Sequence, residues 1–253
     1  MVKTLSKRTK GTIIACCRTP SKANELQTFI EQNRATSSST SATIDIQSLD
    51  LEDQNSIETL TKAIEEKYNR VDLLLNVAGI LGDGNTTPGP ERSIRYLDRD
   101  WVTKTFAVNY IGPVFLSQAL APMMKSKSGG RKKDNDNDKE ERATSIIANL
   151  SARVGSISDN GLGGWISYRS SKAALNQATR TMALELKRQG TWTLCLHPGT
   201  TNTDLSKPFQ KNVKEGRLFP VQFTVDQLLS VIDHMDESHS GGFYDWSGTA
   251  LPY

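Results

Sequence analysis

The sequence predicts an α/β fold in which one Rossmann-type domain, a doubly wound parallel sheet, takes up residues 1–253. Short, continuous apolar runs, such as Thr12–Cys17 and Val71–Asn76, alternate along the chain with segments of helical periodicity, such as Ser56–Tyr68. Continuous apolar runs are typical of strands covered on both faces, and their alternation with helices favours a parallel sheet between two helix layers. The length of 253 residues suits one large domain of this class.

Capping and chain-breaking residues set the limits of the first elements. Gly11 ends a helical segment at Val2–Arg8, and Pro20 ends the strand Thr12–Cys17. A helix over Ser21–Gln32 begins on a residue type that caps helices well. The elements that follow are a Ser/Thr-rich loop at 33–41, a strand that ends near Asp50, a helix at Ser56–Tyr68 and a strand at Val71–Asn76.

The second half of the chain continues the alternation around one polar insert. A loop rich in Gly, Pro and Thr covers residues 82–98 and leads into one long helix at Trp101–Met124. Residues 125–142 are densely charged and offer little to bury, so we expect a disordered insert on the surface. The later elements are a strand at Ser145–Leu150, a helix from Tyr168 to about Gln189, a strand at Trp192–Leu196, a helix at Asp226–Met235 and a strand at Gly242–Trp246.

Composition and charge argue against several classes of protein. The formal net charge is only +3, which speaks against a nucleic-acid binder. Mean hydropathy is −0.47, and no apolar run approaches the roughly 20 residues that span a bilayer, so we expect no membrane segment. No secretory signal follows Met1, and we predict a cytoplasmic protein. Organellar targeting stays open, because residues 1–24 are basic without acids and the natural N-terminus is not established.

Three cysteines, Cys16, Cys17 and Cys195, all lie inside apolar runs. Cys16 and Cys17 are adjacent, so on a strand their side chains point to opposite faces. This arrangement suits neither a disulfide framework nor a zinc site, and we predict buried free thiols in a reducing compartment. We predict no metal site elsewhere in the chain.

The pair Tyr168 and Lys172 is the first candidate for chemistry. Its spacing of four residues places both side chains on one face of a helix. An ammonium beside a phenol favours the phenolate, so we expect the tyrosine pKa to fall from about 10 towards neutrality. Such a tyrosine can donate a proton to a carbonyl oxygen or accept one from an alcohol. The alternative is an ordinary surface pair on an amphipathic helix, and the pair alone does not decide between the two.

Further motifs stand in a fixed order around this pair: Asn76-Val77-Ala78-Gly79 at a strand end, Asn109 in the long helix, Asn149-Leu150-Ser151 at a strand end, and Pro198-Gly199 followed by Thr203. With this order the chain resembles the short-chain dehydrogenase/reductase family over nearly its whole length. Three segments resemble the C-factor and sniffer-type carbonyl reductase branch of that family: 149–157, Gly163-Gly164-Trp165 and 241–246.

The resemblance implies a role for each matching residue. Tyr168 would be the general acid/base, Lys172 would hold the nicotinamide ribose, and Asn109 would anchor a water in a proton relay. The other implied contacts are Asn76, Ala78 and Gly79 on the adenosine side, Asp50 on the adenine amino group, and Pro198, Gly199 and Thr203 beside the nicotinamide. Arg18 would meet a 2′-phosphate, which favours NADP over NAD.

The implied function is hydride transfer between NADP(H) and a small-molecule carbonyl or alcohol substrate, without nucleic-acid or membrane partners. The family resemblance also implies a homo-oligomer formed through the helices Trp101–Met124 and Tyr168–Gln189. The rival hypothesis is a catalytically impaired scaffold that acts as a signalling or protein-interaction module. An intact set of Tyr168, Lys172 and Asn109 speaks against this rival, whereas two departures from the family pattern support it.

The first departure concerns the serine that polarises the substrate carbonyl. The family pattern is Asn-x-Ser-Ser-x-x-Gly, and Asn149 and Gly155 place Ala152 at the position of the second serine. We assign the role to Ser151, the nearest hydroxyl, which a one-residue bulge would turn inward. Ser156 is the other hydroxyl nearby.

The second departure is at the start of the chain. The family begins with a strand and a glycine-rich turn that meets the pyrophosphate, and neither precedes Lys10 here. The first central strand is therefore expected to be missing, which would leave Thr12–Cys17 and Val71–Asn76 beside an unfilled slot. We consider three explanations: an incomplete gene model with a wrong start or a missing upstream exon, a genuine shortened form with weak or absent cofactor binding, or direct pairing of the two flanking strands. We favour the first.

Overall fold

The computed structural model describes residues 1–36, 42–125 and 144–253, and its architecture confirms the α/β prediction. Its strands are β1 (Thr12–Cys17), β2 (Thr43–Ser48), β3 (Leu73–Asn76), β4 (Ser145–Leu150), β5 (Thr191–His197), β6 (Thr200–Thr201), β7 (Leu218–Phe219) and β8 (Gly242–Asp245). Its α-helices are α1 (Val2–Leu5), α2 (Asn24–Thr36), α3 (Gln54–Lys67), α4 (Arg99–Phe106), α5 (Gly112–Leu120), α6 (Ile166–Glu185) and α7 (Val221–Asp233).

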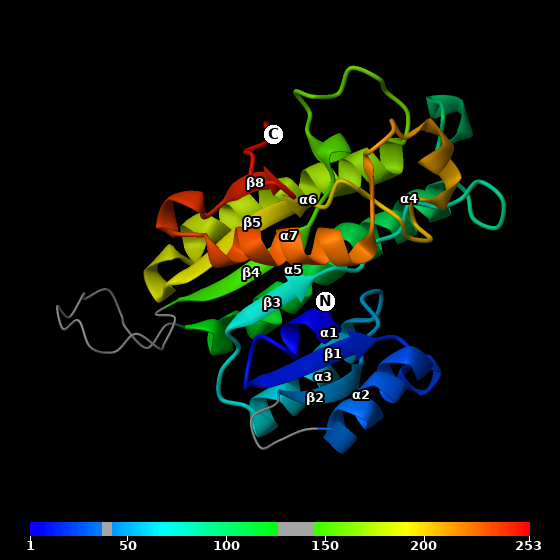
Figure 1. Ribbon diagram of the computed structural model, residues 1–253. Coiled ribbons are helices and arrows are strands. Elements are labelled where there is room, and N and C mark those ends of the chain that lie inside the picture. The colour runs from blue at the N-terminus through cyan, green and yellow to red at the C-terminus, as the bar shows by residue number, and fades with distance from the viewer. Residues whose placement is uncertain (37–41, 126–143) are drawn as a thin grey trace.

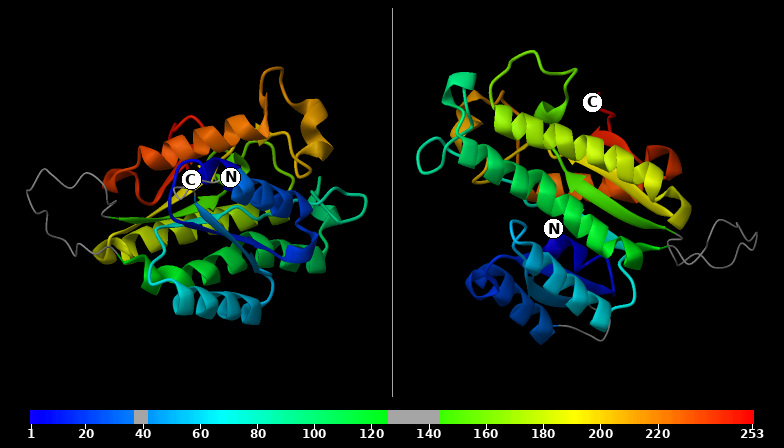
Figure 2. Two further views of the ribbon diagram at one scale, coloured as in Figure 1. Left: turned by 60° about the horizontal axis from the view of Figure 1, so that its bottom comes forward. Right: turned by 180° about the vertical axis from the view of Figure 1, so that it is seen from behind.

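The main sheet has the order β3-β4-β5-β8, and all three of its strand pairs are parallel. Helix α7 covers one face, and α4, α5 and α6 cover the other (Figures 1 and 2). The carboxyl ends of these strands meet at one edge, where Asn76 of β3 stands opposite Asn149 of β4. In an open α/β sheet this is the edge at which ligands bind.

Two hydrophobic clusters hold the helices on the main sheet. One joins Ile147 of β4 to α3 and α5, with Met124 and Leu116 fully or almost fully buried. The other lies on the opposite face, where Leu194 and Leu196 of β5 alternate with residues that face α6, and it packs against α7. Apolar side chains on both faces are the pattern that the continuous runs predict.

The strands β1 and β2 form a separate two-stranded parallel sheet, and β1 is not hydrogen-bonded to β3. Direct pairing of the strands at 12–17 and 71–76, one of the three possibilities considered from the sequence, is therefore wrong for this structure. Packing joins the two sheets instead. Helix α1 places Val2 against the core of the small sheet and Met1 and Leu5 against the core of the main sheet. Figure 1 shows α1 beside the space between β1 and β3.

The open edge of β1 corrects the prediction for the cysteines. Cys195 is buried, and its thiol donates to Thr179 Oγ1 over 3.1 Å. Cys17 is half-buried and Cys16 is exposed, because β1 has a strand neighbour on one side only. The prediction of three buried thiols is thus wrong for Cys16.

The remaining boundaries differ from expectation in small ways. The helix expected at 101–124 begins at Arg99 and contains a π-helical turn at Ala107–Ile111. Helix α2 continues to Thr36, into the segment expected to be a loop. The charged insert lies outside the described residues apart from Lys125.

The described residues contain neither a candidate membrane span nor a candidate metal site. No helix there is both long and apolar enough to cross a membrane. In the same part of the chain, no three His, Cys, Asp or Glu side chains gather closely enough to hold a metal ion.

Candidate active site

A cavity of about 620 Å³ opens at the carboxyl ends of β3, β4 and β5. Its walls come from the loops after these strands, from the start of α6 and from α7. The predicted site residues that line it are Gly79, Ser151, Tyr168, Lys172, Pro198, Gly199 and Thr203. Residues from distant parts of the chain thus meet at one place, as the parallel sheet predicts.

Helix α6 carries Tyr168 and Lys172 into this cavity. It begins at Ile166, so both residues lie in its first two turns, and both are buried. The backbone of Gly155 passes so close to α6 that a Cβ there would lie 2.7 Å from Lys172 Cβ. A glycine at this position allows the loop after β4 to pack directly on the face of the helix that carries Lys172.

Burial, rather than the lysine, dominates the ionisation of Tyr168. The pKa of its phenol is raised because the buried site disfavours the phenolate. Lys172 Nζ donates to the carbonyl oxygen of Leu150 over 2.8 Å and stands 5.8 Å from the centroid of the tyrosine ring. The expected fall of the tyrosine pKa is therefore wrong for this structure, where burial raises the pKa and the ammonium is bonded to the backbone and faces the ring.

The same burial acts on Lys172 in the opposite sense. Desolvation lowers the pKa of its ammonium to about 8, so most of the lysine is still charged at neutral pH. Among the described residues, its three N–H groups have one hydrogen-bond acceptor, the carbonyl oxygen of Leu150. The remaining donors are free to bind a group that enters the cavity.

Asn109 lies in the π-helical turn and is fully buried. Its Nδ2 donates to the carbonyl oxygen of Ile80 (2.9 Å) and to Ser171 Oγ (3.2 Å), and its Oδ1 accepts from the Ile80 amide (2.8 Å). A π-helical turn is a feature that often marks functional sites. Here it brings the amide against the backbone that follows Gly79.

Ser151 and Ala152 take different directions at the end of β4. The Ser151 hydroxyl donates to Asn176 Oδ1 over 2.6 Å, which links the strand to α6. The methyl group of Ala152 instead packs with Tyr168 and Leu81. The position beside the phenol is thus held by Ala152, and the catalytic role assigned to Ser151 stays a prediction.

The residues at the end of β3 have different structural roles. Asn76 is buried, and its Nδ2 donates to Asn149 Oδ1 (2.7 Å) and to Ser117 Oγ (3.2 Å), so its side chain ties β3 to β4 and α5. Ala78 is exposed. A Cβ at Gly79 would lie 3.4 Å from both Asn109 Oδ1 and Lys172 Nζ. Gly79 therefore leaves open the space next to the lysine ammonium.

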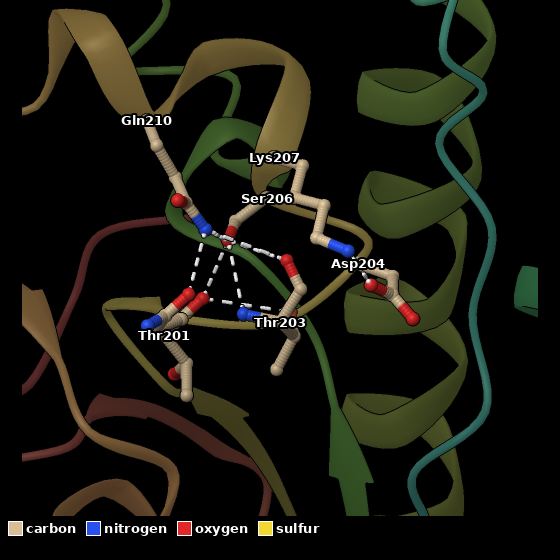
Figure 3. Close-up of polar contacts among 7 residues, drawn as sticks. Thr201, Thr203, Asp204, Ser206, Lys207 and Gln210 are labelled. Carbon is tan, nitrogen blue, oxygen red and sulfur yellow. Dashed lines mark hydrogen bonds and ion pairs between the residues drawn. The ribbon is translucent and has the colours of Figure 1, made fainter.

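The segment after β5 forms the other wall. Gly199 has φ of +69°, and a Cβ there would lie 2.6 Å from the Phe219 ring. Ser206 organises the next residues: its hydroxyl donates to the carbonyl oxygens of Thr201 (2.6 Å) and Thr203 (3.0 Å) and accepts from Gln210 Nε2 (2.7 Å) (Figure 3). Thr203 is thereby held at the cavity wall.

Arg18 and Asp50 lie away from this cavity, after β1 and β2. Arg18 is exposed, and Asp50 is half-buried with its Oδ1 accepting from the Glu52 amide over 3.0 Å. Both follow the carboxyl ends of parallel strands, the edge at which the cavity opens in the main sheet. The structure therefore places them on the expected edge, but in the smaller sheet.

A sequence model of the short chain dehydrogenase family matches residues 1–132 and 138–214. The chain belongs to this family. It is 32% identical over 189 residues to C-signal of Myxococcus xanthus, a match that covers 72% of this chain and 93% of the relative. It is also 29% identical to 1-hydroxy-2-glutathionyl-2-methyl-3-butene dehydrogenase of Rhodococcus sp. (strain AD45), over 81% of this chain and 78% of the relative.

Solved structures of family members are similar in fold. An NADPH-bound carbonyl reductase from chicken fatty liver superposes with a TM-score of 0.77 at 28% identity, over 95% of this chain and 87% of that chain. The carbonyl reductase Sniffer of D. melanogaster gives a TM-score of 0.76 at 27% identity, with the same coverage. These similarities confirm the resemblance to the sniffer-type branch of the family.

Several cavity residues of this family member have no role predicted from the sequence. The sequence marks Trp165 only as part of a branch motif, and Phe209 lies in the 3₁₀-helix Lys207–Asn212, a segment without a readable sequence pattern. His197 precedes Pro198, and burial lowers its pKa to about 4, so its ring is neutral at pH 7. Its buried Nδ1 has no hydrogen-bond partner among the residues that the structure describes. Met1 lines the cavity through the docking of α1, which only the three-dimensional structure reveals.

Proposed function

We propose that the chain is an NADP-dependent carbonyl reductase or alcohol dehydrogenase of the short-chain type, with Tyr168 as its general acid/base. The observation that carries this proposal is the pairing of two buried ionisable residues, Tyr168 and Lys172, on the wall of one cavity. Family membership agrees with it. Buried ionisable groups that line a cavity at the carboxyl edge of a parallel sheet are typical of an active site.

The residues around Lys172 fit a nicotinamide nucleotide. The lysine has N–H donors to spare, and the absence of a Cβ at Gly79 leaves room beside them. Lys172 would hold the nicotinamide ribose, and Pro198, Gly199 and Thr203 would flank the ring. The bound cofactor would supply the hydride.

Tyr168 would handle the proton on the substrate oxygen. Its raised pKa keeps the phenol protonated at neutral pH, which is the form that donates to a carbonyl oxygen. Lys172 and the cofactor ribose would make that proton easier to release. Asn109, whose amide already bonds to Ser171 one residue before Lys172, would anchor a water that reprotonates the tyrosine.

Preference for NADP over NAD would come from Arg18. Its guanidinium is exposed after β1, and such a group suits bidentate contact with a 2′-phosphate. Asp50 and Ala78 would contact the adenosine, together with the backbone at Asn76. The similar carbonyl reductase from chicken was solved with NADPH bound, which supports the same choice here.

Thermal unfolding with added nucleotide tests cofactor binding directly. NADPH at 100 times its Kd should stabilise the folded chain by about 2.7 kcal/mol, and NADH at equal concentration should stabilise it less. Arg18→Ala should remove most of that difference. An unchanged melting temperature with NADPH would favour the rival function, an interaction module that uses the scaffold without catalysis.

Tyr168→Phe tests the chemistry. Reduction of a simple carbonyl compound should fall by about 10²–10⁴-fold, because the phenyl ring has no proton to donate. The melting temperature should stay close to that of the wild type, since only a hydroxyl is lost. A variant that reduces the carbonyl as fast as the wild type would remove the assignment of Tyr168.

A further inference from the structure

The substrate end of the cavity is built around an aromatic wall formed by Trp165 and Phe209. Their ring centroids are 5.3 Å apart with planes inclined at 52°. Trp165 also meets Tyr168 edge to face, at 6.5 Å between centroids. Both distances lie in the range of favourable aromatic contacts. The wall is therefore in direct contact with the ring that carries the proposed catalytic hydroxyl.

The surroundings of this wall are apolar. Leu81, Ala152 and Val154 pack in the same cluster as Tyr168. None of the described residues that line the cavity is acidic, and Arg153, which lines it, pairs its guanidinium with Asp159 over 2.8 Å. The side chains of Leu81, Ala152 and Val154 offer no hydrogen-bonding group to a polar or charged substituent at this part of the cavity.

The backbone of Trp165 shows that its position is held against a local preference. Its φ of 56° is in the left-handed region, the only such value among non-glycine residues of the described chain, and bulky residues rarely adopt it. Such a conformation persists when its surroundings determine it, and it often occurs at functional sites.

Glu91 provides those surroundings. Its carbonyl oxygen accepts from the Trp165 amide over 2.5 Å, and its buried carboxylate accepts from the Ser167 hydroxyl. On the other side, Arg169 donates from its amide to the Trp165 carbonyl oxygen (2.8 Å) and from Nε to the Gly164 carbonyl oxygen (3.0 Å). Trp165 is thus fixed from two directions.

Phe209 is fixed independently, from the segment after β5. It lies one helical turn after Ser206, whose hydroxyl bonds hold that turn against Thr201 and Thr203 (Figure 3). The amide of Phe209 itself donates to the Ser206 carbonyl oxygen over 3.1 Å. The two rings of the wall therefore reach the cavity from separate, internally bonded segments.

We infer that Trp165, with Phe209, determines substrate specificity by favouring carbonyl compounds that carry a flat, unsaturated group next to the carbonyl. The inference rests on the proposed function, because a carbonyl oxygen bonded to the Tyr168 hydroxyl brings its substituent within reach of the wall. A planar group can lie on an aromatic face, whereas a puckered ring of similar volume cannot match it. Glu91 is a positioning residue for this wall.

Two ketones of similar size test the inference: acetophenone, which is planar, and cyclohexyl methyl ketone, which is puckered. The wild type should reduce acetophenone with a kcat/KM at least about tenfold higher, equivalent to about 1.4 kcal/mol. Trp165→Ala and Phe209→Leu should each bring the ratio of the two towards one, mainly through KM, and Trp165→Phe should keep most of it. Glu91→Gln should lower the ratio partway.

Leu162→Ala is the matched control, because Leu162 lies three residues before Trp165 and is 94% exposed; its ratio should equal that of the wild type. Trp165→Gly also removes the ring, and glycine adopts a positive φ without strain. This variant therefore replaces Trp165→Ala in the test if Trp165→Ala does not fold. A ratio that stays at the wild-type value in Trp165→Ala or Trp165→Gly would overturn the inference.

Calorimetric Kd values of the two ketones without NADPH separate this inference from the proposed function. Suppose that neither ketone is reduced, that the wild type binds acetophenone more tightly than cyclohexyl methyl ketone, and that Trp165→Ala binds both equally. The reductase assignment is then wrong, whereas the preference of the aromatic wall for a planar group is supported. If both ketones are reduced, and Trp165→Ala changes neither the ratio of their kcat/KM values nor the ratio of their Kd values, the inference about the aromatic wall is wrong. The reductase assignment is then still supported.

Discussion

The two sheets of this protein use similar apolar strands but reach different degrees of burial. In β4, five of the six residues are buried, whereas in β1 only Ala15 is buried. The difference follows from their neighbours, because β4 lies between β3 and β5 while β1 pairs with β2 alone. An apolar run is therefore buried only as far as the adjoining strands and helices cover it.

The proposed dinucleotide site is divided between the two sheets. The main sheet supplies the cavity with Tyr168 and Lys172 on rigid, enclosed elements. The small sheet supplies Arg18 and Asp50 on partly exposed ones, and it is joined to the main sheet by side-chain packing rather than by a strand ladder. We expect the chemistry half to be well ordered and the adenosine half to be the weaker part of the site.

The largest expected effect is on the main-sheet side, at Gly199. An alanine there would require a positive φ and would press a methyl group 2.6 Å from the Phe219 ring, which Trp246 holds at 4.7 Å between centroids. We expect Gly199→Ala to lower the free energy of unfolding by about 2–5 kcal/mol, measured by urea unfolding.

Two further glycines serve as controls for this prediction. Gly216 has φ of +74° with nothing within 4 Å of a Cβ, so Gly216→Ala isolates the backbone cost. Gly11, beside β1, meets only Thr9 Oγ1 at 3.2 Å, and Gly11→Ala should change stability by under about 1 kcal/mol. Equal losses at Gly199 and Gly11 would contradict the difference in packing between the two regions.

Amide hydrogen exchange compares the sheets directly. Amides of β4 and β5 should exchange at least about a hundredfold more slowly than those of β1 and β2, equivalent to about 3 kcal/mol of opening free energy. The reason is that the core of the small sheet has three buried residues, against eight in each of the two main clusters. Uniform protection across both sheets would show that they open as one unit.

The pH dependence of the free energy of unfolding tests whether burial lowers the pKa of Lys172. Burial lowers the pKa of Lys172 in the folded chain to about 8, below its ordinary value of 10.5. Between these values the unfolded chain binds more protons, so raising the pH favours the folded state. We expect the free energy of unfolding to rise by about 2 kcal/mol more in the wild type than in Lys172→Met between pH 8 and pH 10, without cofactor.

The matched control for this prediction is a variant of Lys67, a lysine beside the small sheet. Lys67 is exposed and paired with Asp45 of β2 over 3.0 Å, and Lys67→Met should keep the rise between pH 8 and pH 10. If Lys172→Met kept the rise as well, the ammonium would not be desolvated in the folded chain.

The smallest expected effect concerns the end of β4. Ala152→Ser would place a hydroxyl beside Tyr168, where it can donate to a substrate carbonyl, and we expect kcat to rise about tenfold, or about 1.4 kcal/mol. Ser151→Ala should instead cost about 1 kcal/mol of stability, because Asn176 Oδ1 loses its donor. A large fall in kcat for Ser151→Ala, with no gain for Ala152→Ser, would support the predicted role of Ser151 as the catalytic serine.

The sequence by itself determined the order of strands and helices, the spacing of Tyr168 and Lys172 and the family to which the chain belongs. These features depend on periodicity, capping and motif order, which act over a few residues. The helix that carries Asn109 was likewise readable, although its π-helical turn was not.

Only the tertiary structure decided how these residues act together. The pKa of Tyr168 rises because distant segments bury it, the Ser151 hydroxyl turns to Asn176 of another element, and β1 stays apart from β3. Burial, hydrogen-bond partners and strand neighbours are set by residues far away in the chain. No local pattern around any one of these residues contains that information.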